Sequence, residues 1–282
     1  MSLGRSLPPG PAHALINAAV KVVAGRRNSR LYRTVYYNQA HVLGPSATFK
    51  QIDASVRGVL SHGAQTSYDL MRALAGGEAV ARDALDFTGE TWEHINQALA
   101  KGRGVIACGS HLSAFNLGML SFSLRGIPVQ ILSRTQPAGG FKLMTDLRDQ
   151  GLLEETPIDA SSLRKAIQRL RAGGVIGTAV DWPEAADPDV QLPFFGAPAQ
   201  LPIGHIRLAL STSAMLMPIS ARWTPERGYF SMSAPTVELE RTGDRQQDLI
   251  CNALRVLAVI QQWISETPEQ WLMYYPVWPG DE

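Results

Sequence analysis

Short apolar segments alternate with amphipathic stretches from about residue 87 to residue 264, and glycine marks many of the changeovers. Residues 104–108, 127–132 and 175–180 are predicted strands, because each is a short apolar run bounded by turn residues. Predicted helices cover residues 91–100, 115–124, 141–150, 161–171, 202–211 and 248–264, and residues 215–221 and 229–234 are predicted to form a hairpin-like pair of strands. This alternation favours the α/β fold class, with a mostly parallel central sheet flanked by helices.

The first 80 residues have a helical pattern instead. Within residues 46–76, Phe49, Ile52, Val56, Val59 and Leu60 follow the three-and-four spacing of a helix face, and glycines at 76 and 77 end the pattern. No change of composition separates this region from the rest. We therefore expect a single domain over residues 1–282, with a helical N-terminal region at 1–80 and an α/β core at 87–282.

Composition excludes some classes of function. A net charge of +1 and a pI near 7.8 argue against broad electrostatic capture of nucleic acid. Cys108 and Cys251 fit a reducing compartment and form no metal-binding spacing. We expect no metal and no cofactor.

No segment reaches the roughly 18–20 apolar residues that cross a bilayer. Residues 14–24 are apolar but short, are interrupted by Lys21, and lack the features of a secretory signal. Arg26, Arg27, Arg30 and Arg33 follow them. Such a helix either lies flat on an anionic membrane or packs on the domain, and the sequence leaves both open.

His111 stands out among the six histidines because the apolar strand in residues 104–116, GVIACGSHLSAFN, runs directly into it. Ligands of open α/β sheets bind at the carboxyl ends of the strands. A neutral imidazole there is suited to remove a proton from an alcohol at neutral pH. The alternative is a ring that only hydrogen-bonds the backbone at the turn. The sequence favours structural roles for the other histidines, which are His13, His41, His62, His94 and His205.

Asn116 follows His111 at the spacing where a partner for the imidazole is expected. If Ser113 is the helix N-cap, Asn116 lies at N3 and serves the cap; otherwise its side-chain oxygen holds a ring nitrogen of His111. An amide does not stabilise an imidazolium, and in serine proteases the Asp-to-Asn change lowers turnover about 10⁴-fold. Asp181, after the strand at 175–180, either supplies the missing charge at the same sheet edge or caps the following turn.

Three further features have two interpretations each. Phe194, Phe195 and Gly196 either form the wall of an apolar pocket or pack within their loop. Arg134, at a strand end, either contacts a phosphate or a donor or is an ordinary surface residue. The aromatic tail at residues 268–278 either packs on the body of the protein or contacts a membrane interface.

Several blocks together resemble the bacterial lipid A late acyltransferases, the lauroyl and myristoyl transferases of the glycerolipid acyltransferase superfamily. GRGVIACGSHLSAFNLG resembles the family's strand and HX4(D/E) motif, and LPFFGAPAQLPIGHIRLAL resembles its PFFG loop and the following helix. SAMLMPISARW is similar to the strand that ends in the family's arginine, here Arg222, and TPEQWLMYYPVW is similar to its closing tryptophan segment.

The resemblance implies a reaction and its partners. His111 would deprotonate a hydroxyl or amine of a lipid or lipid-like acceptor, which attacks an acyl thioester carried by acyl carrier protein or coenzyme A. Arg134 and Arg222 would contact the acceptor phosphate or the donor. The protein would be cytoplasmic, in peripheral contact with the inner face of the plasma membrane.

The chain departs from the family pattern in three places. Asn116 replaces the acidic residue and gives an HX4N motif, the closing segment lacks basic residues before Trp278, and the usual N-terminal spanning helix is missing. Two alternatives to the membrane-bound enzyme therefore remain. One is a relative that binds lipid or acyl carrier protein without transfer, and the other is a specialised acyltransferase with a soluble acceptor.

Overall fold

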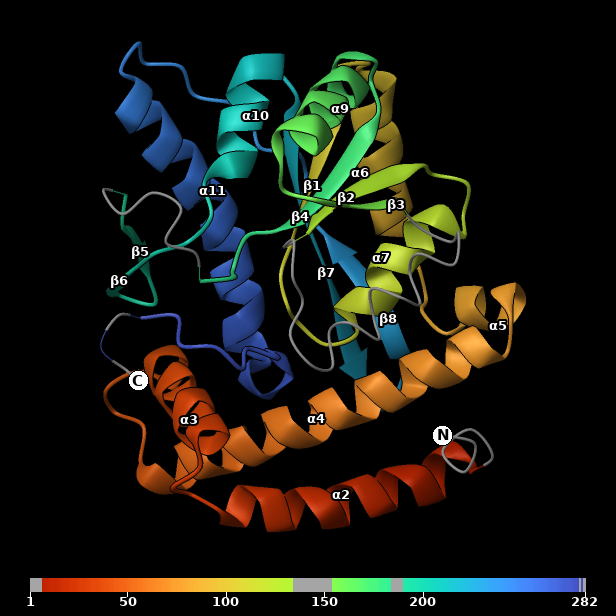
Figure 1. The fold of residues 1–282 in the computed structure, drawn as a ribbon, viewed down its shortest axis with the longest axis vertical. Coiled ribbons are helices and arrows are strands. Elements are labelled where there is room, and N and C mark those ends of the chain that lie inside the picture. The colour runs from red at the N-terminus through yellow and green to blue at the C-terminus, as the bar shows by residue number, and fades with distance from the viewer. Residues whose placement is uncertain (1–6, 134–153, 184–189, 279, 281–282) are drawn as a thin grey trace.

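The computed structural model describes residues 7–133, 154–183, 190–278 and 280. Within them, a six-stranded sheet has the order β3-β2-β4-β1-β7-β8 (Figure 1). Its strands are β1 (Val105–Gly109), β2 (Val129–Ser133), β3 (Glu154–Pro157), β4 (Val175–Ala179), β7 (Met215–Thr224) and β8 (Gly228–Ser233). Only the pairing of β7 with β8 is antiparallel. The predicted α/β class with a mostly parallel sheet is confirmed, as is the strand pair β7–β8.

The central strands are buried on both faces, which explains their nearly continuous apolar sequences. β1 lies between β4 and β7, with Val105 opposite both Val175 and Met215. Gly104 has a φ of +75°, and a Cβ there would lie 2.3 Å from the carbonyl oxygen of Leu170. The start of β1 thus requires glycine.

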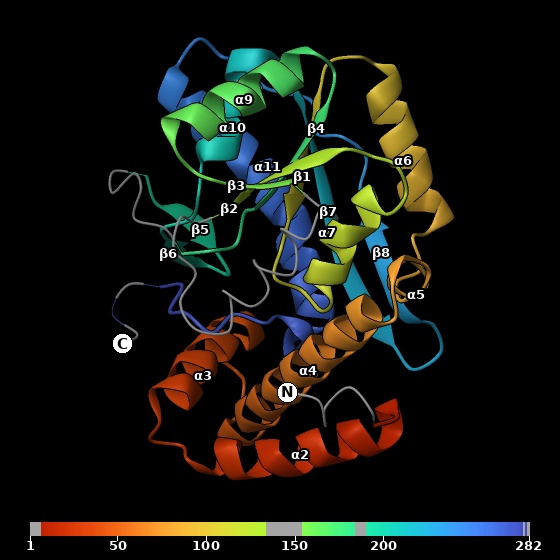
Figure 2. The same cartoon turned by 45° about the vertical axis from the view of Figure 1, so that its right-hand side comes forward.

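Two sets of helices cover the sheet (Figures 1 and 2). Helices α6 (Gly89–Ala100) and α7 (Phe115–Ser123) contribute to the apolar core on one face. Helices α9 (Ala160–Arg171), α10 (Gly204–Thr212) and α11 (Arg245–Glu266) form the core on the other face. The sheet lies between these two layers of helices.

The N-terminal region is helical, as the sequence predicts. It contains α2 (Pro9–Gly25), α3 (Arg30–Leu43), α4 (Phe49–Ala75) and the short α5 (Glu78–Asp83). A capping box between Thr48 and Gln51 begins α4. In Figure 1, α2, α3 and α4 lie together below the sheet. They share a third apolar cluster that includes Leu272 of the C-terminal tail.

After a 3₁₀ turn, η1 (Pro268–Gln270), the C-terminal tail lies beside the segment that follows β1. Trp271 forms an antiparallel bridge with Leu112, and the side chain of Asn38 on α3 donates to the carbonyl oxygens of Met273 and Tyr275. The aromatic tail is therefore packed on the body of the protein.

The structure differs from the sequence-based expectations in a few elements. Strand β3 was not predicted, because it is a short, partly exposed edge strand that begins with two glutamates. The two-stranded hairpin of β5 (Leu192–Phe194) and β6 (Ala197–Ala199) was not predicted either. The helix expected at residues 141–150 lies outside the described residues. None of the described helices has the length and hydropathy needed to cross a bilayer.

Candidate active site

His111 and Asp181 come together because of the register of two neighbouring strands. β1 and β4 are parallel, with Gly109 opposite Ala179. Each of the two functional residues follows its strand by two positions. Parallel strands end at the same edge of a sheet, so the two side chains meet there.

The Asp181 carboxylate accepts three hydrogen bonds. Its Oδ1 lies 2.8 Å from His111 Nδ1, and its Oδ2 lies 2.7 Å from the backbone nitrogen of His111 and 2.9 Å from Trp271 Nε1. Asp181 is fully buried. Burial alone raises the pKa of its carboxyl, but His111 and the indole of Trp271 lower it, and the net direction is downward. Asp181 is therefore ionised at neutral pH.

An ionised carboxylate only accepts hydrogen bonds, so Nδ1 of His111 carries a proton, and in the neutral ring the free lone pair is then at Nε2. Nε2 makes no hydrogen bond to any described residue. The ring packs edge-on against Phe115 at 4.7 Å between centroids and lies 5.0 Å from the ring of Trp182. This tautomer is the one that accepts a proton at Nε2.

Hydrogen bonds from α4 and from the C-terminal tail hold the turn that carries His111. Ser113 has a φ of +50°, which is unusual for a residue with a side chain, and its Oγ is hydrogen-bonded to His62 Nε2 at 2.9 Å. The backbone N–H of Ser113 donates to the carbonyl oxygen of Gln270, and the backbone N–H of Leu272 donates to the carbonyl oxygen of His111. Burial lowers the pKa of His62 to about 4, so this ring is neutral. His62 thus has a structural role, and it fills this role through its hydrogen bond to Ser113, which the sequence around His62 does not indicate.

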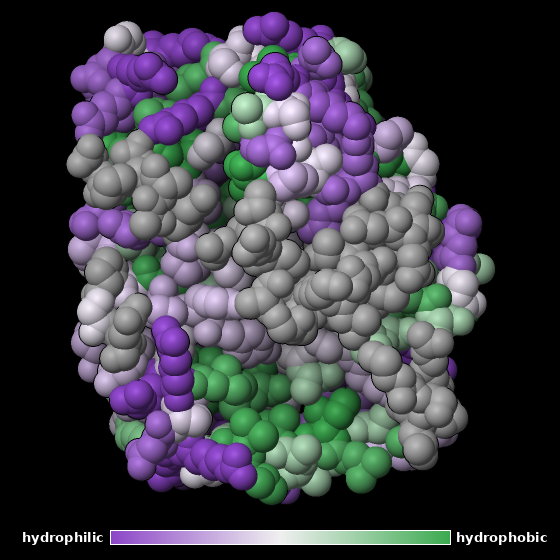
Figure 3. All heavy atoms as spheres, viewed as in Figure 1, coloured by the Kyte–Doolittle hydropathy of each residue, from purple (hydrophilic) through white to green (hydrophobic). Residues whose placement is uncertain are grey.

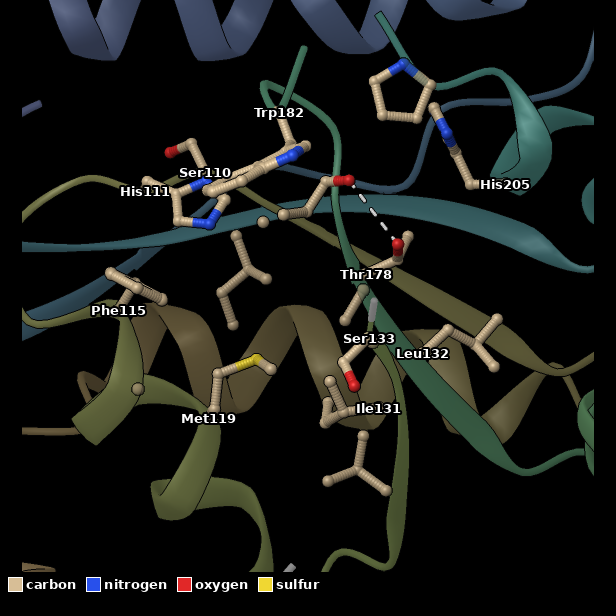
Figure 4. Close-up of a pocket in the computed structure, with 18 of the residues that line it drawn as sticks. Ser110, His111, Phe115, Met119, Ile131, Leu132, Ser133, Thr178, Trp182 and His205 are labelled. Atoms are coloured by element: carbon tan, nitrogen blue, oxygen red, sulfur yellow. Dashed lines mark hydrogen bonds between the residues drawn. The ribbon is translucent and has the colours of Figure 1, made fainter. Parts of the chain in front are cut away.

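A cavity of about 450 Å³ opens in front of His111 (Figure 4), a size typical of small-molecule sites, which span roughly 300–1,000 Å³. Its wall on the sheet consists largely of small residues, which include Ala107, Gly109, Gly177, Ala179 and Ala221. Gly118, Met119 and Phe122 of α7 face them across the cavity. Small side chains on the sheet leave room for an apolar chain between α7 and the strands.

Asn116 belongs to the first turn of α7 and is half-buried. Ala114, rather than Ser113, is the N-cap, so Asn116 lies at N2 and the expected N3 position is wrong. The ring nitrogen Nδ1 of His111 is bonded to Asp181. Asn116 is absent from the described wall of the cavity. An orienting role for Asn116 stays a prediction.

Phe194, Phe195 and Gly196 form the hairpin that joins β5 to β6. Phe195 and Gly196 both have positive φ values, as a tight hairpin turn requires. Phe194 is fully buried against Trp271 and Trp278, and Phe195 lies close to both. The hairpin therefore supports the tryptophan that bonds Asp181, and its three predicted site residues are absent from the described cavity wall.

Arg222 lies on β7, pairs with Glu266 of α11 at 2.6 Å, and is absent from the described wall of the cavity. Its contact with substrate stays a prediction. Arg134 lies outside the described residues. Among the described residues, no group of three or more His, Cys, Asp or Glu side chains is placed to hold a metal.

Sequence reasoning missed His205 as a residue of the site. It was assigned to the packing or surface of its helix, but in the structure it is buried and lines the same cavity as His111 (Figure 4). A histidine in the first turn of a helix whose other buried residues, Ile206, Leu208 and Ala209, are apolar was the available signal.

One surface of the N-terminal region is apolar. Leu15 and Val22 on α2 are 61% and 65% exposed, and Val23 is also exposed. Figure 3 shows apolar residues gathered at this end of the molecule. Arg26 and Arg27, at the end of α2, are exposed beside them.

Comparison with known proteins gives two findings. Residues 3–279 match the family described as bacterial lipid A biosynthesis acyltransferase. Phosphatidylinositol mannoside acyltransferases of Mycobacterium tuberculosis, from strains CDC 1551 / Oshkosh and ATCC 25618 / H37Rv, are each 24% identical over an alignment of 200 residues, and the match covers 67% of this chain. The match spans 59% of the length of those relatives.

Proposed function

The chain belongs to the bacterial lipid A biosynthesis acyltransferase family, and we propose that it transfers a fatty acyl group from a thioester to a hydroxyl or amine of a lipid-like acceptor. The observation that carries the proposal is a histidine whose Nδ1 is bonded to a buried carboxylate and whose ring lines an apolar cavity. The mannoside acyltransferases to which the chain is similar have a lipid acceptor in their name, which supports this class of acceptor.

His111 acts as the general base. Its Nε2 removes the proton from the acceptor hydroxyl while the oxygen attacks the thioester carbonyl carbon. The imidazolium that forms is stabilised by the ionised Asp181. When the tetrahedral intermediate collapses, the carbon–sulfur bond breaks and the leaving thiolate takes the proton from Nε2. The products are an ester and a free thiol.

The donor is an acyl thioester of acyl carrier protein or coenzyme A, and its acyl chain lies between α7 and the small residues of the sheet. This placement is supported by the apolar wall of the cavity around Met119, Phe122 and Ile131. Arg134 and Arg222 remain the proposed contacts for acceptor phosphate or donor, and Asn116 remains the alternative orienting partner of His111.

The α2 surface supports a peripheral position on the inner face of the plasma membrane. Its exposed Leu15, Val22 and Val23 would enter the apolar boundary of the lipid, and Arg26 and Arg27 would meet anionic headgroups.

The test is transfer by the purified protein from acyl-coenzyme A and acyl–acyl carrier protein, followed by mass spectrometry of the lipid products. We expect His111→Ala to lower the rate by roughly 10²–10⁴-fold, the contribution of a general base. His94→Ala is the matched control, because His94 bonds Ser233 and lies outside the described cavity wall. Equal rates for wild type and His111→Ala would exclude His111 from the mechanism.

Asn116 motivates a second proposal, a relative that binds lipid or acyl carrier protein without transfer. The variant Asn116→Glu separates the two. Activity that appears only in the variant would support the impaired relative. A wild type that is already active, and whose rate changes little in Asn116→Glu, would support the enzyme with Asp181 as the acid.

A further inference from the structure

His205 lies in the first turn of α10 and is only 5% exposed. Figure 4 shows its ring at the end of the drawn cavity opposite His111, with Thr178 between the two in this view. Its sequence neighbours Leu201, Pro202 and Gly204 also line the cavity. His205 is thus a polar group in the wall of a largely apolar space.

Neither ring nitrogen of His205 has a hydrogen-bond partner among the described residues. A buried polar atom left without a partner costs about 1–3 kcal/mol, and native structures seldom keep one without a ligand, water or functional reason. Burial lowers the pKa of His205 to about 4, so the ring is neutral and offers one donor and one acceptor.

The start of α10 is a second and independent feature. Ile203 is its N-cap, and no side chain caps the helix. The first N–H groups of a helix need outside acceptors. Of the described residues that line the cavity, only Glu155 and Arg207 carry a full charge at neutral pH, and Arg207 is exposed. Helix N–H groups also attract anions, but no buried Lys or Arg among the described residues of the wall is there to pair with an ionised phosphate. The neutral ring of His205, with one donor and one acceptor, matches an uncharged amide or hydroxyl group.

We propose that His205 and the first turn of α10 form a second subsite of the cavity, which hydrogen-bonds an uncharged amide or hydroxyl group of a bound substrate. The inference rests on the proposed function for the source of that group. The pantetheine arm of a thioester donor carries secondary amides, and a lipid-like acceptor carries hydroxyls.

The test measures binding without turnover, by titration calorimetry on the full chain. Three unreactive probes are used: S-dodecyl pantetheine for the amides, dodecyl β-glucoside for hydroxyls, and dodecyl ethyl sulfide for the alkyl chain alone. We expect His205→Leu to weaken the amide or the hydroxyl probe about tenfold, the equivalent of one hydrogen bond, and to leave the alkyl probe unchanged. The probe that weakens identifies the donor or the acceptor as the source. His205→Gln, which keeps a donor and an acceptor, should recover most of the affinity.

His94→Leu is the matched control and should bind all probes like the wild type. Unchanged binding of both polar probes by His205→Leu, an equal loss for all three probes, or no binding of the polar probes to the wild type would overturn the subsite. The result is separable from the proposed function: selective loss in a protein that transfers no acyl group refutes the function alone, and active transfer without selective loss refutes the subsite alone.

Discussion

Replacing Asp181 with asparagine tests the proposed base most directly, because the geometry determines which way the new amide turns. Oδ2 of Asp181 accepts two N–H groups, from the His111 backbone and Trp271, whereas Oδ1 accepts one, from His111 Nδ1. The amide oxygen of Asp181→Asn will therefore take the position with two donors. Its NH₂ group then faces Nδ1, which must accept, and the proton moves to Nε2.

That tautomer has no lone pair at Nε2 and is unable to act as the base. In serine proteases, the same change in a His–Asp pair lowers turnover about 10⁴-fold by the same cause. At about 1.36 kcal/mol per factor of ten, this is roughly 5 kcal/mol of transition-state stabilisation. We expect a loss of that order in Asp181→Asn, with an affinity for the acyl donor close to that of the wild type.

The assay is steady-state acyl transfer, with nitrogen NMR of the His111 ring as a direct report of the tautomer and a thermal melt as a check of folding. Asn116→Ala tests the alternative orienting partner: it removes the amide on α7 and leaves the three bonds of Asp181 intact. If Asp181 orients the ring, this variant should change the rate by only about threefold, as for an ordinary hydrogen bond. A loss below about tenfold in a folded Asp181→Asn, or a larger loss in Asn116→Ala, would refute the assignment of Asp181 as the orienting acid.

Three other predictions follow from the cavity, the buried histidines and the α2 surface. Gly118 and Ala221 both line the cavity, and a Cβ at Gly118 would contact the Cβ of Ala221 at 3.9 Å. A leucine at position 118 would therefore fill part of the cavity, and Gly118→Leu should shift the acyl-length profile, measured by mass spectrometry, towards chains shorter by about four carbons, the number that leucine adds to a close-packed wall. Burial lowers the pKa of both His62 and His205 to about 4 from an ordinary value near 6.5, so the unfolded state binds more protons than the folded state between these pH values. In denaturant titrations, each histidine should therefore reduce the free energy of unfolding by about 2 kcal/mol as the pH falls from 7 to 5. The variant His205→Leu should show only about half of the reduction that the two histidines cause together. Sedimentation with anionic vesicles should show Leu15→Ser/Val22→Ser binding at least about tenfold more weakly, because each apolar side chain contributes about 1.5 kcal/mol when buried; unchanged sedimentation, or no binding by the wild type, would favour a soluble acceptor.

The sheet was predictable because its central strands are short, apolar and bounded by glycine. The sequence also placed His111 and Asp181 at strand ends, and the parallel order of β1 and β4 was the only missing step to their contact. The position of Ser113 was not predictable. A serine before a helix is typical of an N-cap, but the tertiary bond to His62, from a helix far away in the sequence, holds it at positive φ instead.

The chemistry of the wall was harder to predict than that of the strand ends. The tryptophan that bonds Asp181 lies in the tail, 90 positions later, and its role depends on the bridge to Leu112. His205 was hidden because a lone histidine on an apolar helix is usually satisfied by packing neighbours. Only the absence of a partner among the described residues distinguishes it, and that absence is not encoded in local sequence.

On the proposed mechanism, His111 remains an effective base although Asn116 replaces the acidic residue of the motif, because the acid that orients His111 and residue 116 belong to different parts of the fold. Asn116 lies on α7, which begins after a turn with Ser113 at positive φ, whereas Asp181 follows β4, whose register with β1 is set by five residue pairs. The carboxylate from β4 also receives the backbone N–H of His111, so it orients the ring and the turn together. The asparagine at position 116 therefore leaves the bonds between His111 and Asp181 intact.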